Sequence, residues 1–457
     1  MASRADQLHS QQFTVQRAVA ELAMRDADAA IAPGRRIGGS LLAGLLLAAL
    51  GVAAGGVYAA LRPGRDASWR DGASVIVEAE TGARFVYRDG VLYPVLNYSS
   101  ARLVLGANAS TVRASRSALA GVPRGHPVGI PGAPDALPAS ADLLSGGWTL
   151  CSRPASSPSS VESVLRVGAA PVADGLAGRG LVAVDPAGGL HLLWNHRRFA
   201  ITAPAVVLAA FAWSRQAAVP VAPALLNAIP AGPDLGPVTL PGGPGPSVVD
   251  GYRSGQVFVV ENQSGGKQYG VALAGGLAEV TPVQADLLLA AGANGPSGRP
   301  MPMGEAQYAG APRAGSLVPT GDAAPPALAP SLVPAAGGSV CAGFADGAAL
   351  PSLALVAALP RESGELSTGT GDAAVDWIGV APGHGAVVES LAGPGARTGA
   401  LALLTDAGQR FPVPSADVLA MLGYAGVRPL RLPSALVAVV PSGPALDPAA
   451  AALLSSP

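Results

Sequence analysis

The sequence has little charge, few aromatic residues, one lysine and two cysteines. Charged residues make up 13% of the chain, aromatic residues 4%, and the formal net charge is -1. A balance so close to neutral excludes a general basic surface for binding nucleic acid. Two cysteines are too few for a disulfide framework or a cysteine-based zinc site, although they can form one bridge.

Glycine and proline are abundant, at 60 and 43 residues. Such a composition can indicate disorder. However, 49% of the residues are hydrophobic and many of them fall in periodic blocks, which favours small folded modules joined by proline-rich connectors. The length alone predicts two or more domains.

The longest uncharged stretch covers residues 37–61 and lies between Arg35-Arg36 and Arg62. At about 1.5 Å per residue it forms roughly 37 Å of helix, enough to cross a hydrocarbon core of about 30 Å. A cleaved signal peptide is the alternative, but its apolar region is only roughly 7–15 residues long and a long polar segment would not precede it. The stretch therefore predicts a single uncleaved membrane span.

Arginines flank both ends of this span, with a small excess on the N-terminal side. The positive-inside rule then weakly favours a cytoplasmic N-terminus, and long domains translocate largely regardless of charge. We expect residues 1–36 to be a cytoplasmic arm and the rest of the chain to lie outside the plasma membrane. Val15, Ala18, Val19 and Leu22 predict an amphipathic helix in the arm, capped by Ser10 or Thr14. Its apolar face fits either the membrane surface or a docking partner.

The extracytoplasmic part contains four copies of one pattern, which begin near Phe85, Leu190, Val271 and Leu401. Alternating apolar residues around a turn predict a hairpin in each copy. A short capped helix, another strand and a second helix follow. The expected N-caps are Asn97 or Ser99, Thr202, Thr281 and Ser415. A Pro-x-Gly motif is expected to stop the last helix, as in Pro123-Arg-Gly125, Pro230-Ala-Gly232 and Pro441-Ser-Gly443, with a degenerate Pro312-Arg-Ala-Gly315 in the third copy.

The fold prediction is α+β: one transmembrane helix, then a periplasmic domain of four β-β-α-β-α repeats packed around a mixed central core, duplicated with pseudo-two-fold symmetry. A unit of this size cannot bury enough surface alone, so the copies should pack on the sequence between them. The predicted boundaries are 1–36 (arm), 37–61 (span), 74–125 (repeat 1), 126–185 (core half 1), 186–240 (repeat 2), 250–332 (repeat 3 with a proline-rich insertion), 337–398 (core half 2) and 399–450 (repeat 4).

Cys151 and Cys341 open the two core halves at matching places. In an oxidising compartment they can form a disulfide that ties the halves together. Two buried free thiols are the alternative, because free cysteine behaves as a small hydrophobic residue.

No catalytic motif is found, and no catalytic, cofactor-binding or metal-binding residue is predicted. The only lysine, Lys267, lacks the glycine spacing and the following Ser or Thr of a P-loop. Ser339 lacks the second glycine of a nucleophile elbow and is expected in a turn. His191 and His196 are expected at the surface or at a hairpin end.

Two further groups receive structural interpretations. Glu78 and Glu80 are expected on the solvated face of a strand. The tryptophans Trp148, Trp194, Trp213 and Trp377 are expected in the cores of the repeats and the core halves rather than in a ligand platform.

The chain resembles the EccB family, a membrane core component of the actinobacterial type VII (ESX) secretion system. The resemblance rests on Arg4-Ala-Asp-Gln7 and Ser10-Gln-Gln-Phe13 in the arm, the span, the segments 90–106 and 122–135, and the two cysteine regions. It covers essentially the whole chain, with a departure in the Ala-, Pro- and Gly-rich region 296–336.

The resemblance implies an inner-membrane subunit that assembles with EccC-, EccD- and EccE-like membrane subunits, near the mycosin protease, and forms homo-oligomers within the translocon. It implies export of WXG100, PE and PPE proteins. The predicted function is therefore a non-enzymatic scaffold without cofactors. The alternatives are a membrane-anchored periplasmic enzyme, since the family has been labelled an ATPase, and a cell-wall-binding protein.

Overall fold

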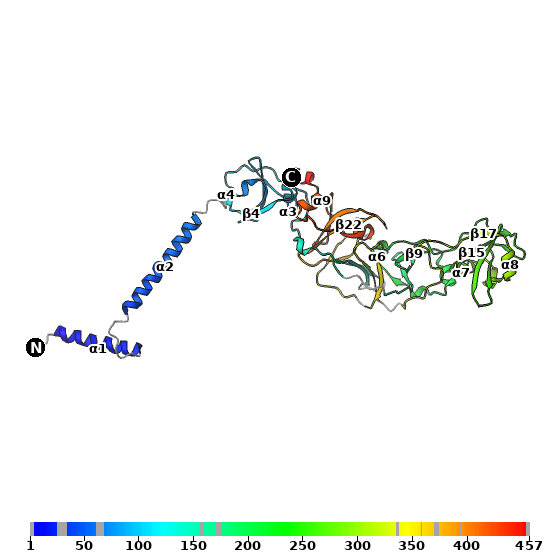
Figure 1. The fold of residues 1–457 in the computed structure, drawn as a ribbon, viewed down its shortest axis with the longest axis horizontal. Helices are drawn as coiled ribbons and strands as arrows, with labels where there is room; N and C mark the ends of the chain where they lie inside the picture. Colours follow the sequence, from blue (N-terminus) through cyan, green and yellow to red (C-terminus); the bar gives the residue numbers. More distant parts are fainter. Residues whose placement is uncertain are drawn as a thin grey trace. The chain divides into compact units, whose positions relative to one another are not determined.

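The computed structural model describes residues 4–24, 34–60, 68–155, 160–169, 175–334, 338–357, 359–369, 374–393 and 395–453. The chain divides into two compact units, Met1–Ser68 and Trp69–Pro457 (Figure 1). Each unit is described by itself.

The first unit contains two helices, α1 (Arg4–Met24) and α2 (Gly34–Ala60). The capping prediction for α1 is wrong, because the helix begins at Arg4. Thr14 lies inside it and donates its hydroxyl proton to the carbonyl of Ser10 at 2.7 Å, the usual bond of a threonine in a helix interior. In α2, the segment Gly39–Gly56 has a mean hydropathy of 1.8 and is long and apolar enough to cross a membrane.

The second unit contains four sheets of four or five strands, each of which defines what we call a module. It also contains a two-stranded sheet of β11 (Gly245–Pro246) and β12 (Arg253–Ser254), and a central sheet. Module 1 contains β1 (Ser74–Glu78), β2 (Arg84–Arg88), β3 (Val91–Pro94), α3 (Tyr98–Leu105), β4 (Ser110–Ala114) and α4 (Arg116–Leu119). Module 2 contains β7 (Leu181–Val184), β8 (Leu190–Trp194), β9 (Arg197–Ile201), α5 (Pro204–Ala210), β10 (Val219–Pro220) and α6 (Pro223–Ala228).

Module 3 contains β13 (Val257–Glu261), β14 (Lys267–Leu273), β15 (Gly276–Glu279), α7 (Pro282–Ala290), β16 (Met301–Pro302), α8 (Glu305–Gly310) and β17 (Arg313–Ser316). Module 4 contains β22 (Gly385–Leu391), β23 (Ala400–Thr405), β24 (Arg410–Val413), α9 (Ala416–Met421), β25 (Leu430–Pro433), α10 (Ser434–Ala438) and α11 (Pro448–Ala451).

The four module sheets share one strand order: β3-β2-β1-β4, β9-β8-β7-β10, β15-β14-β13-β16 and β24-β23-β22-β25, with β17 added to the edge of the third. Modules 1, 2 and 4 thus have one strand more than the predicted unit, and module 3 has two more. The added strands β1, β7, β13 and β22 precede the hairpins and pair in parallel with the strand that follows the helix. A hairpin pattern does not reveal such a strand, because its parallel partner is reached only through a crossover.

Two of these added strands lie inside segments that we expected to be core halves. β7 falls in 126–185 and β22 in 337–398, yet both pair within modules 2 and 4. What remains of the two segments builds a six-stranded central sheet. Its order is β19 (Ser352–Val356), β18 (Ser339–Phe344), β5 (Trp148–Pro154), β6 (Val161–Arg166), β21 (Trp377–Gly379) and β20 (Glu365–Ser367).

The Pro-x-Gly motifs do more than stop a helix. The proline carbonyls of 123, 230 and 441 each accept a bond from the last hairpin strand, at 2.8–2.9 Å. A Cβ on the following glycine would lie 2.3–2.5 Å from an aromatic ring carbon of Tyr93, Phe199 or Phe411, so only glycine fits. In module 3, Ala278 takes the place of the aromatic residue, and the pairing register with β17 shifts between Leu277 and Ala278. This difference explains why the Pro-x-Gly motif is degenerate in module 3.

Three of the four predicted helix caps are present. Asn97, Thr281 and Ser415 accept backbone bonds at the starts of α3, α7 and α9, and Thr281 forms a capping box with Gln284. Thr202 is not a cap: Ala203 holds that place in a left-handed conformation, and Pro204 starts α5.

The modules pack in pairs through their helices. α3 contacts α9 and α11, which joins module 1 to module 4, and α5 contacts α7, which joins module 2 to module 3. α6 and α10 contact each other, and α6 also contacts strands β5 and β6 of the central sheet. Figure 1 shows the same arrangement, with module 1 (blue to cyan) beside module 4 (orange to red).

Candidate functional site: the disulfide and charge network of the central sheet

Cys151 and Cys341 lie opposite each other on the antiparallel strands β5 and β18, and the structure joins them in a disulfide. They are 190 residues apart in sequence, and both are 1% exposed. The bond therefore connects the two predicted core halves in the middle of the sheet that both halves build.

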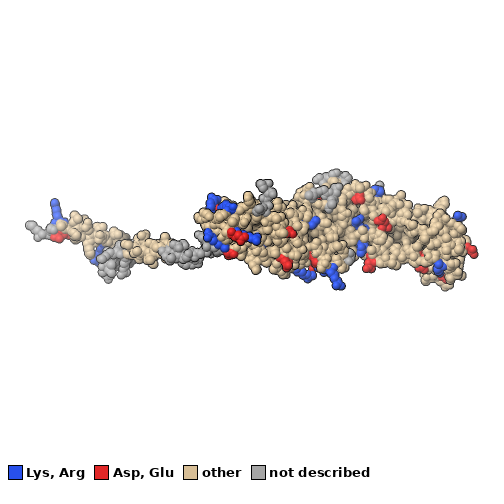
Figure 2. All heavy atoms as spheres, turned by 90° about the horizontal axis from the view of Figure 1, so that it is seen from above, with Lys and Arg blue, Asp and Glu red and all other residues tan. Residues whose placement is uncertain are grey.

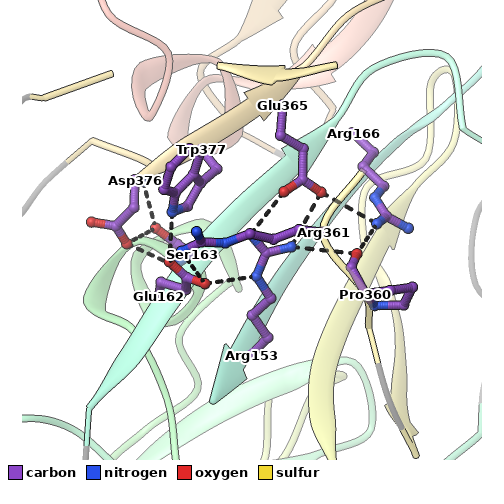
Figure 3. Close-up of polar contacts among 9 residues, drawn as sticks. All are labelled: Arg153, Glu162, Ser163, Arg166, Pro360, Arg361, Glu365, Asp376 and Trp377. Atoms are coloured by element: carbon purple, nitrogen blue, oxygen red, sulfur yellow. Dashed lines mark hydrogen bonds and ion pairs between the residues drawn. The ribbon is translucent and has the colours of Figure 1, made fainter. Parts of the chain in front are cut away.

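A buried charge network begins two residues after the disulfide, at Arg153 (Figure 3). The Arg153 side chain is 4% exposed and lies between two carboxylates. Its Nε is 2.9 Å from Glu162 Oε1, and its Nη2 is 2.7 Å from Glu365 Oε2. Glu162 comes from β6 and Glu365 from β20, so one guanidinium links both halves of the chain.

The network continues on both sides of Arg153. Arg166 Nη2 lies 3.3 Å from Glu365 Oε1, and Arg361 Nη2 lies 2.8 Å from Glu162 Oε2. The indole of Trp377 donates to Glu162 at 2.6 Å. Glu162 and Glu365 thus each bind two guanidinium groups.

These contacts decide what the network can do chemically. Burial raises the pKa of Glu162, but hydrogen bonds from Arg361, Arg153 and Trp377 outweigh it and hold the pKa below its usual range. Burial likewise opposes the charge of Arg153, while Glu365 and Glu162 raise its pKa. A carboxylate kept ionised by such bonds is a poor proton donor, so the geometry fits a structural lock rather than acid catalysis.

A second polar link joins β6 to β21 in the same sheet. Asp376 Oδ2 accepts bonds from the Ser163 backbone and hydroxyl, both at 2.7 Å, and the Asp376 backbone donates to the Ser163 hydroxyl at 2.9 Å. This reciprocal pair fixes the parallel register beside Trp377 (Figure 3).

Lys267 begins strand β14, and its side chain is 52% exposed. Its nearest acidic partner is Glu261, at 4.0 Å across the hairpin. The preceding glycines form the hairpin turn, where Asn262 Oδ1 accepts the backbone proton of Gly266 at 2.7 Å. A phosphate-binding loop leads from a strand into a helix, and this lysine leads from a turn into a strand.

The histidines and Ser339 occupy structural positions. His191 Nε2 is 3.2 Å from Asp185, and His196, at the β8–β9 hairpin end as expected, bonds to the carbonyl of Pro351 at 2.9 Å. Ser339 is not in a turn: it starts β18 and is buried. Among the described residues, no group of three His, Cys, Asp or Glu side chains could hold a metal ion.

Glu78 is not on a solvated face. It is buried at the end of β1 and pairs with Arg116 at 3.1 Å. Hydrogen bonds from Thr81 and Arg116 lower its pKa. Glu80 is exposed and accepts the Arg116 backbone proton.

Trp148 is fully buried in one cluster with Leu150 and Phe344 of the central sheet, as expected of a core residue. Trp194 and Trp213 are half-buried against the core of module 2, and Trp377 binds Glu162 in the charge network. On the face in Figure 2, the charged residues form small separate patches of both signs.

The sequence interpretation missed the charge network. Arg153 and Glu162 lie in strands, where single charged residues are usually exposed. A signal was present, because Arg153 closely follows the apolar run that contains Cys151.

Among the described residues, one N-terminal helix is long and apolar enough to cross a membrane, and a large disulfide-linked domain of helices and small sheets follows it. This arrangement fits the class of membrane-anchored proteins with a large folded domain. A family model described as "Type VII secretion system ESX-1, transport TM domain B" matches residues 1–456. The chain therefore belongs to the EccB family of type VII secretion systems.

Curated relatives and solved structures agree with this assignment. The "ESX-5 secretion system ATPase EccB5" of Mycobacterium tuberculosis H37Rv is 31% identical over 314 residues, which cover 63% of this chain and 59% of that protein. The "ESX-3 secretion system ATPase EccB3" of Mycolicibacterium smegmatis is 28% identical over 472 residues, 96% of this chain and 88% of that protein.

Two solved structures share the fold. A chain of an intact ESX-5 inner membrane complex matches with a TM-score of 0.65 at 24% identity, over 100% of this chain and 96% of that chain. The EccB3 dimer from the ESX-3 core complex matches with a TM-score of 0.62 at 26% identity, over 83% of this chain and 99% of that chain.

Proposed function

We propose that this chain is a structural subunit of a type VII (ESX) secretion inner-membrane translocon. The observation that carries the proposal is the family match over residues 1–456, together with the likeness to chains of an ESX inner membrane complex and of an EccB dimer. In this role α2 anchors the protein, α1 lies in the cytoplasm as a docking helix, and the second unit lies outside the membrane.

The proposed assembly contains EccC-, EccD- and EccE-like membrane subunits, with the mycosin protease nearby and further copies of this chain. WXG100-, PE- and PPE-type proteins are the proposed export substrates. The exposed apolar side chains Leu8, Val15, Val19 and Leu22 of α1 offer the arm a surface for a cytosolic partner.

We further propose that the four modules are copies of one repeat in a duplicated domain. Their shared strand order supports this proposal. The helix contacts support it as well. A two-fold rotation that exchanges module 1 with module 3 and module 2 with module 4 carries the α3–α9 contact onto the α7–α5 contact. The Cys151–Cys341 pair and the α6–α10 contact then lie on the pseudo-two-fold axis.

The charge network around Arg153 supports a scaffold, because its charged groups pair with one another and link the two halves of the central sheet. The names of the curated relatives contain the word ATPase, which makes nucleotide hydrolysis the second candidate function. Lys267 is its natural test, because it is the only lysine of the chain. Lys267→Ala should leave secretion unchanged, whereas loss of secretion with normal protein level and assembly would favour the ATPase.

Co-purification in mild detergent tests the scaffold directly. A tagged copy of the full chain should bring down the other membrane subunits, and its deletion should prevent their assembly into a large complex on a native gel. The proposal fails if the partners form that complex without this chain.

A further inference from the structure

A cavity of about 510 Å³ lies where module 2 meets module 4. Its walls come from four places: Ala228–Ala231 after α6, residues 347–349 after β18, the loop after β22, and the start of α10. Pockets of roughly 300–1,000 Å³ suit ligands of the size of a short peptide. The lining is mostly alanine, glycine and proline, so most of its side chains are small and apolar.

Two arginines face this cavity, and their surroundings differ. Arg431 is fully engaged: its Nε is 3.4 Å from Glu389, and its Nη2 donates to the carbonyl of Ala396 at 3.2 Å. Arg197, from β9, has a buried Nε without a hydrogen-bond partner. No carboxylate pairs with Arg197 among the described residues, so this positive charge is uncompensated.

The walls are held in place by hydrogen bonds that leave Arg197 out. His196 is fixed to the carbonyl of Pro351 at 2.9 Å, and Gly347 donates to the carbonyl of Arg431 at 2.9 Å. The Arg431 backbone donates to Asp346 at 2.9 Å. The site is therefore preorganised, and the guanidinium of Arg197 on its wall has no carboxylate partner among the described residues. A guanidinium is the group best suited to bind a carboxylate in a bidentate manner.

We propose that this cavity binds the end of a peptide chain with a free α-carboxylate. The carboxylate pairs with the guanidinium of Arg197, which lines the cavity and has no carboxylate partner among the described residues. The preceding residues of the peptide lie against the alanine and proline walls, which accept an extended chain of small apolar side chains. A bare phosphate would leave these walls unused.

The test uses the detergent-solubilised full chain and two probes, Ala-Ala-Ala with a free carboxylate and its C-terminal amide, followed by isothermal titration calorimetry. The free acid should bind at least about tenfold more tightly than the amide. Arg197→Gln should remove this preference, while Arg299→Gln, an exposed arginine of module 3, should retain it. Thermal unfolding of each variant shows whether it folds.

Equal binding of acid and amide, or no binding of the acid to folded wild-type protein, would overturn the proposal. An Arg197→Gln variant that folds and binds the acid as tightly as wild type would do the same. Inorganic phosphate that displaced the peptide at equal concentration would overturn the assignment to a peptide.

Discussion

The two module pairs use the same helix-to-helix contact but different chemistry. Between modules 1 and 4, Leu103 of α3 lies in one buried cluster with Val418 and Leu419 of α9. Arg102 of α3 adds a hydrogen bond to the carbonyl of Met421 at 3.0 Å. Between modules 2 and 3, the contact rests on apolar side chains, with Val207 of α5 in one buried cluster with Val283 and Leu287 of α7.

The difference shows how a repeat can keep its geometry while its contacts change. A guanidinium at the carboxyl end of α9 satisfies a free carbonyl and complements the helix dipole. This contact fixes the orientation of α3 relative to α9. Apolar packing contributes more to the free energy of unfolding, but it constrains the relative orientation of two helices less. We therefore expect the 2–3 pair to depend on apolar packing alone, and the 1–4 pair to depend on apolar packing and on the hydrogen bond from Arg102.

Breaking the central sheet should weaken both pairs at once. Arg153→Ala leaves Glu162 and Glu365 buried with one partner fewer, and loss of one member of a buried pair costs about 3–5 kcal/mol. Urea unfolding measures this loss, and hydrogen exchange should rise in α3 and α7 alike. Arg361→Ala, at a side chain that is 56% exposed, is the control and should cost about 0–1 kcal/mol. A loss below about 1 kcal/mol for Arg153→Ala would contradict the network's role.

Truncation of an apolar contact should affect the 2–3 pair alone. Leu287→Ala removes a buried side chain from α7, which should cost about 2–5 kcal/mol because a cavity remains. Hydrogen exchange should accelerate in α5 and α7 and stay unchanged in α3. Leu328→Ala, at an exposed position, serves as the control. Equal acceleration in α3 would show that the pairs are not independent.

The polar contact should matter only for the 1–4 pair. Arg102→Ala leaves the carbonyls of Met421 and Ala109 without this donor, at a cost of about 1–3 kcal/mol. Exchange should rise in α3 and α9 while α5 and α7 are unaffected. Arg113→Ala, on an exposed part of β4, is the control in the same module. If Arg102→Lys had the same free energy of unfolding as wild type, two hydrogen bonds from one guanidinium would not be needed.

The smallest effect is expected at Tyr424, whose hydroxyl donates to the carbonyl of Pro138 at 2.9 Å. Tyr424→Phe should cost about 0.5–1.5 kcal/mol. Burial raises the pKa of Tyr424, so its contribution is present below the usual tyrosine pKa of about 10 and is lost as pH rises through the higher folded value. Above about pH 10, the free energy of unfolding of wild type should therefore fall more steeply with pH than that of the variant. Parallel pH curves would contradict this reading.

The sequence predicted the features that depend on local rules. The apolar helix follows from composition, and the caps at Asn97, Thr281 and Ser415 follow from side chains that bond to the next turn. The helix cap predicted at Thr202 is wrong, because the neighbouring Ala203 is the N-cap and takes a left-handed conformation that residue propensities do not indicate. Non-local features were harder, since β7 and β22 are defined by parallel partners across a helix.

The candidate site was predicted in part. The matching positions of Cys151 and Cys341 in the sequence indicate a bridge. The network around Arg153 was not foreseen, because Glu162 and Glu365 come from strands on either side of a long insertion. Only the folded sheet brings their carboxylates to one guanidinium.

The central claim is that two halves of the chain form one domain, tied at Cys151 and Cys341 and located, in the proposed function, outside the membrane. Mass spectrometry of the full chain, purified without reductant and digested without reduction, tests it most directly. The account predicts one cross-linked peptide pair that contains both cysteines. Recovery of both as alkylated free thiols would contradict the bridge and the extracytoplasmic location of the domain.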